Sequence, residues 1–227
     1  MNFWQKIKPL LFFLSCVPLL RWIFLYSTDG LGVDASLFMM QSSAQTTFAF
    51  LCITLLIAPL RQILRQPNIL LVRRMFGLFT FFYACCHLLV WVWGERRANF
   101  SLMAQDLSAR PGIYLGLLGF VLLFILAITS SQGMMRKLGR HWIKVHSLIY
   151  VVGVIGIAMF FVMRHPEQGY TEAYWGAAIM AVLLCWRIGA YWIKRRNIAA
   201  EMLRVNAKVA ALKAEQAASQ ESKNANP

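Results

Sequence analysis

The sequence predicts an all-α, polytopic membrane protein built as a bundle of six transmembrane helices. Of its 227 residues, 59% are hydrophobic, and the mean hydropathy is +0.56; soluble domains are less apolar. A helix that crosses a bilayer needs ~20 mostly apolar residues. Six segments meet this requirement, at residues 9–27, 46–63, 75–93, 112–130, 142–163 and 174–192. They predict one membrane domain, residues 1–196, followed by a cytoplasmic tail, residues 197–227.

The first apolar segment is expected to stay in the membrane as a helix. Lys6 and Lys8 precede it as in a signal peptide, but Arg21 interrupts it and no small-x-small cleavage site follows. A polar loop, residues 28–45, leads to the second segment. A short basic connection precedes the third segment, and the longest outer loop, residues 94–111, separates the third from the fourth.

A second basic connection, residues 130–144, joins the fourth and fifth segments. After the sixth segment, residues 197–220 are rich in Ala, Lys and Glu, which predicts a surface helix. The last residues, 221–227, are expected to be disordered because they carry too little apolar surface to fold.

The charge distribution predicts how the bundle is oriented. The net charge is +14. With both termini in the cytoplasm, the inner segments hold Lys6, Lys8, Arg61, Arg65, Arg73, Arg74, Arg136, Lys137, Arg140, Lys144, Lys194, Arg195 and Arg196. The outer loops hold Arg96, Arg97, Arg110 and Arg164, mixed with Asp29, Asp34, Glu95, Asp106, Glu167 and Glu172. This positive-inside bias predicts a multi-pass protein of the bacterial inner membrane, in contact with anionic lipid rather than nucleic acid.

Two histidines within apolar segments are the residues best suited to carry chemistry. An ionisable side chain at membrane depth is costly and usually has a function or a firm partner, and imidazole is a common ligand of haem iron. His87 and His146 lie on different predicted helices, and small residues beside His87 leave room for a flat macrocycle. They predict a membrane electron carrier. The simpler alternative is that each histidine is bonded to a neighbouring helix.

The depths of these residues differ. His87 lies 13 residues beyond Arg74, ~20 Å along a helix, whereas His146 lies 6 residues beyond Arg140, ~9 Å. This difference of about 10 Å makes them a poor axial pair for one haem. Met159, 19 residues beyond Arg140, is nearer the depth of His87, and a thioether can ligate haem iron. The alternative is a methionine that fills a gap in the core.

Three roles stay open for His146. Tyr150 and Gly153 follow it at helical spacing, and the histidine could ligate a second haem, hold a flavin or quinone, or cap the inner mouth of the bundle. His141, at the basic interface, and His165, in an outer loop, are expected to be surface residues.

Several short motifs follow one another in a fixed order between about residues 20 and 195. They are Gly30-Leu31-Gly32, Ala58-Pro59-Leu60-Arg61, Gln66-Pro67, Arg73-Arg74, Gly77-Leu78, His87-Leu88, Arg110-Pro-Gly-Ile-Tyr-Leu-Gly, Thr129-Ser-Ser-Gln, Met135-Arg-Lys-Leu-Gly-Arg-His-Trp, and Val145-His146 with Tyr150. Together they resemble the MsrQ (YedZ) family of haem-binding membrane subunits in bacterial methionine-sulfoxide reductase systems. That family belongs to the ferric-reductase-like transmembrane group.

The resemblance implies haem b and flavin mononucleotide (FMN) as cofactors and a non-catalytic role in electron transfer. Members pass electrons from the quinone pool or a cytoplasmic flavin reductase to a periplasmic, molybdopterin-containing (MsrP-like) subunit, which reduces methionine sulfoxide in oxidised proteins. His87 and His146 match haem-associated histidines of the family, and Arg74 and Tyr150 lie in matching motifs, so all four are candidates for cofactor binding. Met159 stands where the family usually carries another histidine and is the third candidate iron ligand. A five-coordinate iron or another ligand is the alternative.

Two other functions compete with this one. A ferric-reductase-like carrier with another acceptor would need an attached or partnered flavin or nicotinamide domain, and none is recognisable in the sequence. A transporter or structural membrane protein without a cofactor would leave His87 and His146 as packing residues, but nothing resembles the paired broken helices of transporter repeats.

Overall fold

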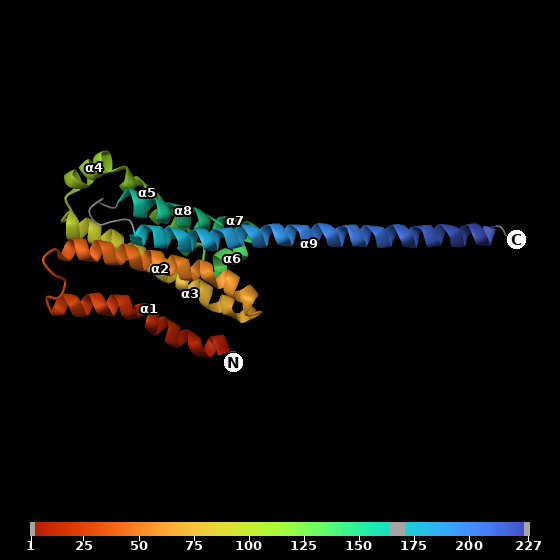
Figure 1. Ribbon diagram of the computed structural model, residues 1–227, viewed down its shortest axis with the longest axis horizontal. Coiled ribbons are helices and arrows are strands. Elements are labelled where there is room, and N and C mark those ends of the chain that lie inside the picture. The colour runs from red at the N-terminus through yellow and green to blue at the C-terminus, as the bar shows by residue number, and fades with distance from the viewer. Residues whose placement is uncertain (1–2, 164–170, 225–227) are drawn as a thin grey trace. The chain divides into compact units, whose positions relative to one another are not determined.

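Six long helices make up the membrane part of the protein. The computed structural model describes residues 3–163 and 171–224, and within these ranges six helices or helical runs are long and apolar enough to span a bilayer. In chain order the elements are α1 (Phe3–Ser27), α2 (Ala35–Ile63), η1 (Pro67–Ile69), α3 (Leu70–Leu89), η2 (Val90–Glu95), α4 (Phe100–Ala109), α5 (Pro111–Ile128), α6 (Gln132–Leu138), α7 (His141–His146), α8 (Leu148–Val162) and α9 (Thr171–Asn224) (Figure 1). No strand occurs in the described ranges, so the all-α, six-span fold class is confirmed.

Two of the spans are composite. The third runs from Pro67 to Glu95, because the 3₁₀ turn η1 and the π-helical turn η2 extend α3 at its two ends. The fifth joins α7 to α8 through Ser147, which is the C-cap of one helix and the N-cap of the other. The third span therefore begins seven residues before Arg74, and this shift matters for the depth of His87.

The second span begins earlier than the sequence predicts. Residues 28–45 were expected to form a loop, but α2 starts at Ala35, where the Asp34 side chain caps it by accepting a hydrogen bond of 2.9 Å from the Leu37 amide. Thr46 and Thr47 then donate their hydroxyl protons to carbonyls of the preceding turn, at 2.7 and 2.8 Å. The polar composition does not interrupt this helix, because the side-chain hydroxyls donate to backbone carbonyls of the same helix.

The longest outer loop also contains structure that was not expected. The Asn99 side chain caps the short helix α4 by accepting from the amides of Ser101 and Leu102. The guanidinium of Arg96 pairs with both carboxylate oxygens of Asp106, which is 8% exposed and also lies 3.9 Å from Arg110. A two-point contact of this kind holds α4 in one orientation.

The chain divides into two compact units, residues 1–184 and residues 185–227. Residues 197–220 are helical as predicted, but they continue α9 without a break instead of forming a separate helix. Residues 221–224, which were expected to be disordered, are the end of α9; residues 225–227 lie outside the described residues. The predicted domain boundary between residues 196 and 197 stays a prediction.

Within the first unit, α2 packs along α3, and α5 packs along α8. The central apolar cluster draws on α2, α3, α5, α8 and the start of α9, and its buried members are Leu51, Leu55, Ala84, Leu123, Leu126, Ile149, Val152 and Met180. A second cluster joins α1 to α2 and α3 through the aromatic rings of Trp22, Phe50, Phe79 and Tyr83, together with Met75. The packing of α3 against both α2 and α5 makes α3 the central helix of this unit.

Two hydrogen bonds tie α1 to the rest of the first unit. The indole of Trp22 donates to the Ser42 hydroxyl at 2.8 Å, and the Tyr83 hydroxyl donates to the Ser15 carbonyl at 2.5 Å. Few side chains of α1 are buried; Trp22 and Ser15 are the two within its described residues. The position of α1 therefore depends strongly on these contacts.

We expect Tyr83→Phe to lower the free energy of unfolding by about 1 kcal/mol, because it removes a buried hydrogen bond while keeping the ring. The measurement is the thermal unfolding midpoint of the detergent-purified protein. Tyr114→Phe is the matched control, since Tyr114 is more than half exposed. Equal midpoints for Tyr83→Phe and the parent protein would contradict the assigned role of this hydrogen bond.

Candidate functional site

His87 lies on α3 and is anchored by a hydroxyl of α2. Its Nδ1 atom is 2.9 Å from the Ser43 Oγ atom, and Ser43 donates its own proton to the Met40 carbonyl at 3.1 Å. With the Ser43 proton on the Met40 carbonyl, Ser43 is placed to accept from His87 in the tautomer that carries the imidazole proton on Nδ1. The Nε2 atom is then left with a free lone pair, and the half-buried ring is oriented and ready to bind a metal through it.

Met159 lies at the same level of the bundle as His87. The Phe81 ring of α3 contacts Phe120 and Phe124 of the antiparallel helix α5, at centroid distances of 5.7 and 5.9 Å. Six residues beyond Phe81, His87 is therefore level with Gly116 of α5. A Cβ atom at Gly116 would lie 3.3 Å from the Cε atom and 3.9 Å from the sulfur of Met159. The thioether thus reaches the level of His87, where it packs against α5.

His146 is anchored in the opposite sense. Its Nε2 atom is 3.3 Å from the Thr129 hydroxyl, which donates its proton to the Ile125 carbonyl at 2.7 Å. His146 therefore donates from Nε2, and Nδ1 is the nitrogen left with a lone pair. The ring stacks on Trp142 with centroids 4.0 Å apart, and the Trp142 indole donates to the Thr129 carbonyl at 3.0 Å.

The structure does not bring the two histidines together. His87 is level with Gly116, and His146 contacts Thr129, 13 residues further along α5, which corresponds to about 20 Å. The separation exceeds the 10 Å expected from the sequence because Arg74, used there as a marker of depth, lies more than one turn inside its span. The two candidate residues therefore lie at different depths of the bundle.

The remaining predicted residues lie towards His146. Tyr150 is half-buried and packs against the central cluster one turn beyond His146, whereas the Arg74 side chain is exposed on α3. Its neighbour Arg73 is half-buried and acts electrostatically on His146. His141 is exposed, as expected, and His165 lies outside the described residues.

Sequence reasoning missed the hydroxyls that orient the two histidines. Ser43 was hidden in a segment taken for a loop, although it lies on α2 with no exposed surface. Thr129 stood in a recognised motif but was not connected with His146. A serine or threonine on a helix next to a membrane histidine is the signal that would have suggested both.

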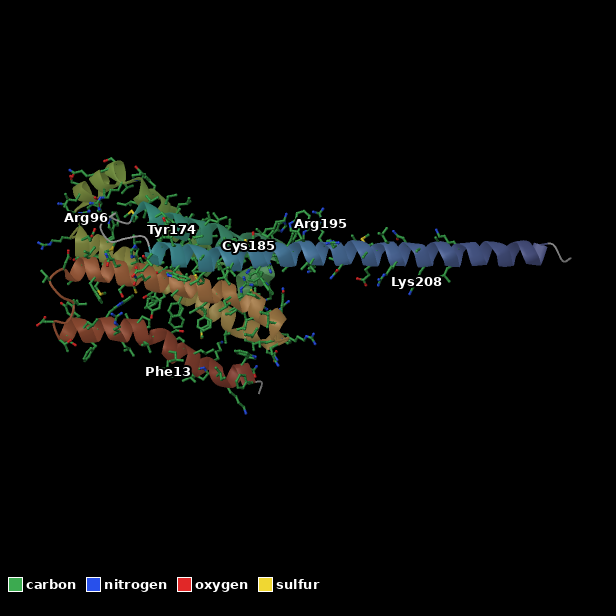
Figure 2. The ribbon with its side chains drawn as sticks, viewed as in Figure 1. Phe13, Arg96, Tyr174, Cys185, Arg195 and Lys208 are labelled. Carbon is green, nitrogen blue, oxygen red and sulfur yellow. The ribbon has the colours of Figure 1, made fainter. Side chains whose placement is uncertain are left out.

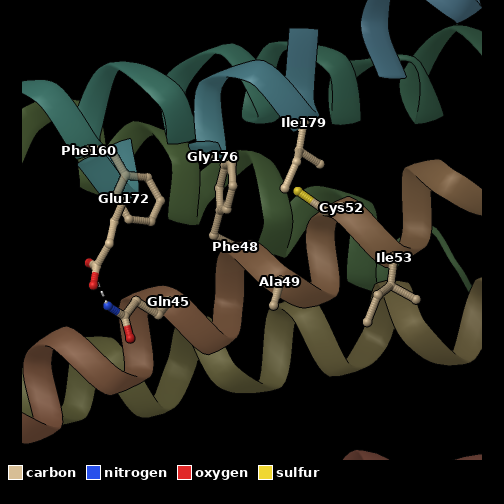
Figure 3. Close-up of a pocket in the computed structure, with 9 residues that line it drawn as sticks. All are labelled: Gln45, Phe48, Ala49, Cys52, Ile53, Phe160, Glu172, Gly176 and Ile179. Atoms are coloured by element: carbon tan, nitrogen blue, oxygen red, sulfur yellow. Dashed lines mark hydrogen bonds between the residues drawn. The ribbon is translucent and has the colours of Figure 1, made fainter. Parts of the chain in front are cut away.

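A groove opens between α2, α8 and the first turns of α9 (Figure 3). Its volume is about 510 Å³, and its lining consists of Gln45, Phe48, Ala49, Cys52, Ile53, Phe160, Glu172, Gly176 and Ile179. The ring of Phe48 meets Phe160 edge-on at 4.8 Å between centroids. At its polar end, the Gln45 amide donates to the Glu172 carboxylate at 3.2 Å. The groove is therefore an apolar slot with one acidic end.

Comparison with known proteins identifies the family. The model of the ferric reductase like transmembrane component matches residues 42–157, which include both histidines. A protein of Bordetella pertussis strain Tohama I is 40% identical over 84% of this chain and 92% of its own length; it is named protein-methionine-sulfoxide reductase heme-binding subunit MsrQ. The chain belongs to the MsrQ family.

Other MsrQ proteins show the same relationship. Those of Polaromonas naphthalenivorans and Ralstonia nicotianae are 36% and 37% identical, over 84% and 83% of this chain and 87% of their own length. No solved structure matches the chain. Membership of the MsrQ family confirms the resemblance read from the sequence motifs and places this chain among multi-pass transmembrane proteins.

Proposed function

We propose that this protein is the haem b-binding electron-transfer subunit of a methionine-sulfoxide reductase system, with His87 as an axial ligand of the iron. The observation that carries the proposal is the hydrogen-bond chain from His87 through Ser43 to the Met40 carbonyl. Histidines that ligate metals almost always donate their other ring N–H to a fixed acceptor. The names of the relatives, which describe haem-binding subunits, agree with this donor set.

The residues around His87 define how a haem would be held. Haem b supplies one-electron oxidation and reduction when it is bound. His87 would ligate the haem iron, and Ser43 would keep the imidazole from rotating. Met159, at the same level, is proposed as a second ligand. Aromatic rings of α3 and α5 deeper in the bundle, such as Phe81 and Phe120, would help to exclude water from it.

His146 belongs to a second proposed cofactor position, near the basic connections of the bundle. Trp142 and Thr129 fix its ring, Tyr150 lies one turn away, and Arg73 and Arg74 bring positive charge from α3. A planar, redox-active group is suited to this position, either a second haem or FMN, whose phosphate a guanidinium binds well. His146 would bind this group through Nδ1, or it would remain a hydrogen-bond donor at the edge of the site.

The membrane orientation then sets the direction of electron flow. The positive-inside bias supports an inner-membrane protein with both termini in the cytoplasm, which places His146 in the cytoplasmic half and His87 in the periplasmic half. Electrons would leave from the His87 position to a periplasmic, molybdopterin-containing MsrP-like partner that repairs methionine-sulfoxide residues. This chain itself would hold and pass electrons, and the partner would carry out the reduction.

The groove in Figure 3 supports a quinol as the electron donor. It is formed by membrane helices and lined mostly by apolar side chains, so a lipid-borne molecule can enter it from the bilayer. The Glu172 carboxylate at its polar end would accept a hydrogen bond from a quinol hydroxyl and would repel the phosphate of a phospholipid. A cytoplasmic flavin reductase, delivering electrons to the His146 position, is the alternative donor.

We expect His87→Ala to abolish haem retention. The measurement is a dithionite-reduced minus oxidised spectrum of the detergent-purified protein, with haem quantified as the pyridine haemochrome. The parent protein should show a b-type spectrum with one or two haems per chain. His141→Ala is the control, because that imidazole is exposed. Full haem content in His87→Ala would disprove the proposed ligation.

We expect Ser43→Ala to weaken haem binding while the protein stays folded, because loss of an outer partner of a metal-ligating histidine typically costs about 10–100-fold in affinity. The measurement is haem retained after competition with apomyoglobin. Thr47→Ala is the matched control, since the Thr47 hydroxyl donates to the Ser43 carbonyl of its own helix. Equal retention in both variants would show that Ser43 does not orient the ligand.

We expect Met159→His to lower the haem reduction potential, because His/Met ligation raises it relative to bis-histidine ligation. A potentiometric titration of the reduced haem band measures the change. Met163→His is the control, because Met163 packs one turn away, against Gly112. An unchanged spectrum and potential in Met159→His would remove Met159 from the ligand set.

A further inference from the structure

The second unit carries a regular apolar stripe, which lies beyond the residues 42–157 that the ferric reductase like model matches. Along α9, apolar side chains recur at alternating steps of three and four residues, and Arg195 occupies the one polar position of the series. The apolar members are Ile188, Tyr191, Ile198, Met202, Val205, Val209 and Leu212. This spacing is that of the core positions of a coiled coil, maintained over more than three heptads.

The apolar side chains of the stripe are exposed in the part of the chain that the structure describes. Each of its seven apolar side chains is 45–61% exposed, and from Tyr191 to Ala210 every side chain of α9 is exposed. The candidate span Thr171–Ala210 is longer than a bilayer requires. Ile188 and Tyr191 lie before the cluster Lys194, Arg195 and Arg196, which belongs at the polar boundary of a membrane, and Ile198 to Leu212 follow this cluster. Five apolar side chains on one face of a helix in water are expected to pack against a partner surface, because burying apolar surface is favourable.

We propose that two copies of this chain associate through this stripe as a parallel coiled coil. Copies inserted in the same membrane share one orientation, so their α9 helices leave on the same side and run parallel. The stripe of one copy then meets an identical spacing in the other, and each side chain can enter a hole formed by four residues of the facing helix. Arg195 at a core position would set the register, as single polar core residues do.

The residues beside the stripe favour a second copy over a membrane surface. A helix that lies on lipid needs a broad apolar face, whereas this stripe is one side chain wide and is flanked by Glu201, Asn206 and Lys208. In a parallel pair, Glu201 of one copy faces the uncharged side chain of Asn206 of the other, so this contact adds no charge repulsion. Lys208 of one copy faces Lys213 of the other, which is a weak repulsion that salt screens.

Added salt should therefore have opposite effects on self-association and on binding to lipid. Self-association should strengthen when salt is added, because the Lys208–Lys213 repulsion is screened while apolar burial is retained. Binding of the cationic helix to anionic lipid should weaken under the same conditions.

The test is oxidative cross-linking of the full-length protein in vesicles that contain phosphatidylglycerol. Val205→Cys is placed in a background where the exposed Cys185 is changed to serine, and Ala207→Cys, on the opposite side of the helix, is the matched control. We expect a covalent dimer for Val205→Cys, more of it at high salt, and none above background for Ala207→Cys. Equal cross-linking at both positions, none at either, or a decrease with salt would overturn the proposal.

A second measurement does not depend on thiol chemistry. Light scattering of the detergent-purified parent protein should give the mass of a dimer, and Val205→Glu should give that of a monomer, whereas Ala207→Glu should leave the dimer intact. Thermal unfolding of each variant checks that the membrane bundle is unchanged. A parent protein that is monomeric at all concentrations and salt levels would also disprove the coiled coil.

Discussion

Polar side chains inside the spans must find partners within the protein, because the hydrocarbon of a membrane offers none. Most hydroxyls in the spans solve this locally: Thr54 and Thr80, for example, each donate to the carbonyl four residues before them. Other hydrogen bonds connect separate spans or join a side chain to a distant helix end, and four of them bear on the assembly of the bundle and its histidines. These four link Trp22 with Ser42, Tyr83 with Ser15, His87 with Ser43 and His146 with Thr129.

These four contacts determine both the assembly of the bundle and the chemistry it can support. The first two position a helix that buries little of its own surface. The other two fix the tautomers of the histidines, and they do so in opposite senses, so that His87 offers Nε2 and His146 offers Nδ1. The two histidines are therefore not equivalent. His87 is anchored by Nδ1, as expected of a histidine that ligates a metal through Nε2. His146 is anchored by Nε2 and stacks on Trp142.

The two units carry different features. The first unit contains the family match and every candidate cofactor residue. The second carries Arg195 and Lys208, labelled in Figure 2, beside an apolar stripe that the cofactor positions do not explain. Because the two features rest on different residues, electron transfer and self-association can be tested separately.

Much of the architecture follows from the sequence alone, because a membrane span is a local property: enough apolar residues in succession, bounded by charges. This is why the six spans and their order could be predicted. The family was recognisable from its ordered motifs, and His87, His146 and Met159 stay predictions. The start of α2 was predicted wrongly, since the hydroxyls of Ser43, Thr46 and Thr47 donate to carbonyls of their own helix, which therefore tolerates a polar composition. Only the tertiary structure decided the level of each residue and the partner of each imidazole. Ser43 and His87 are separated by 44 positions in the sequence, and their hydrogen bond depends on how α2 and α3 are aligned, which the packing of large side chains sets and no local pattern records.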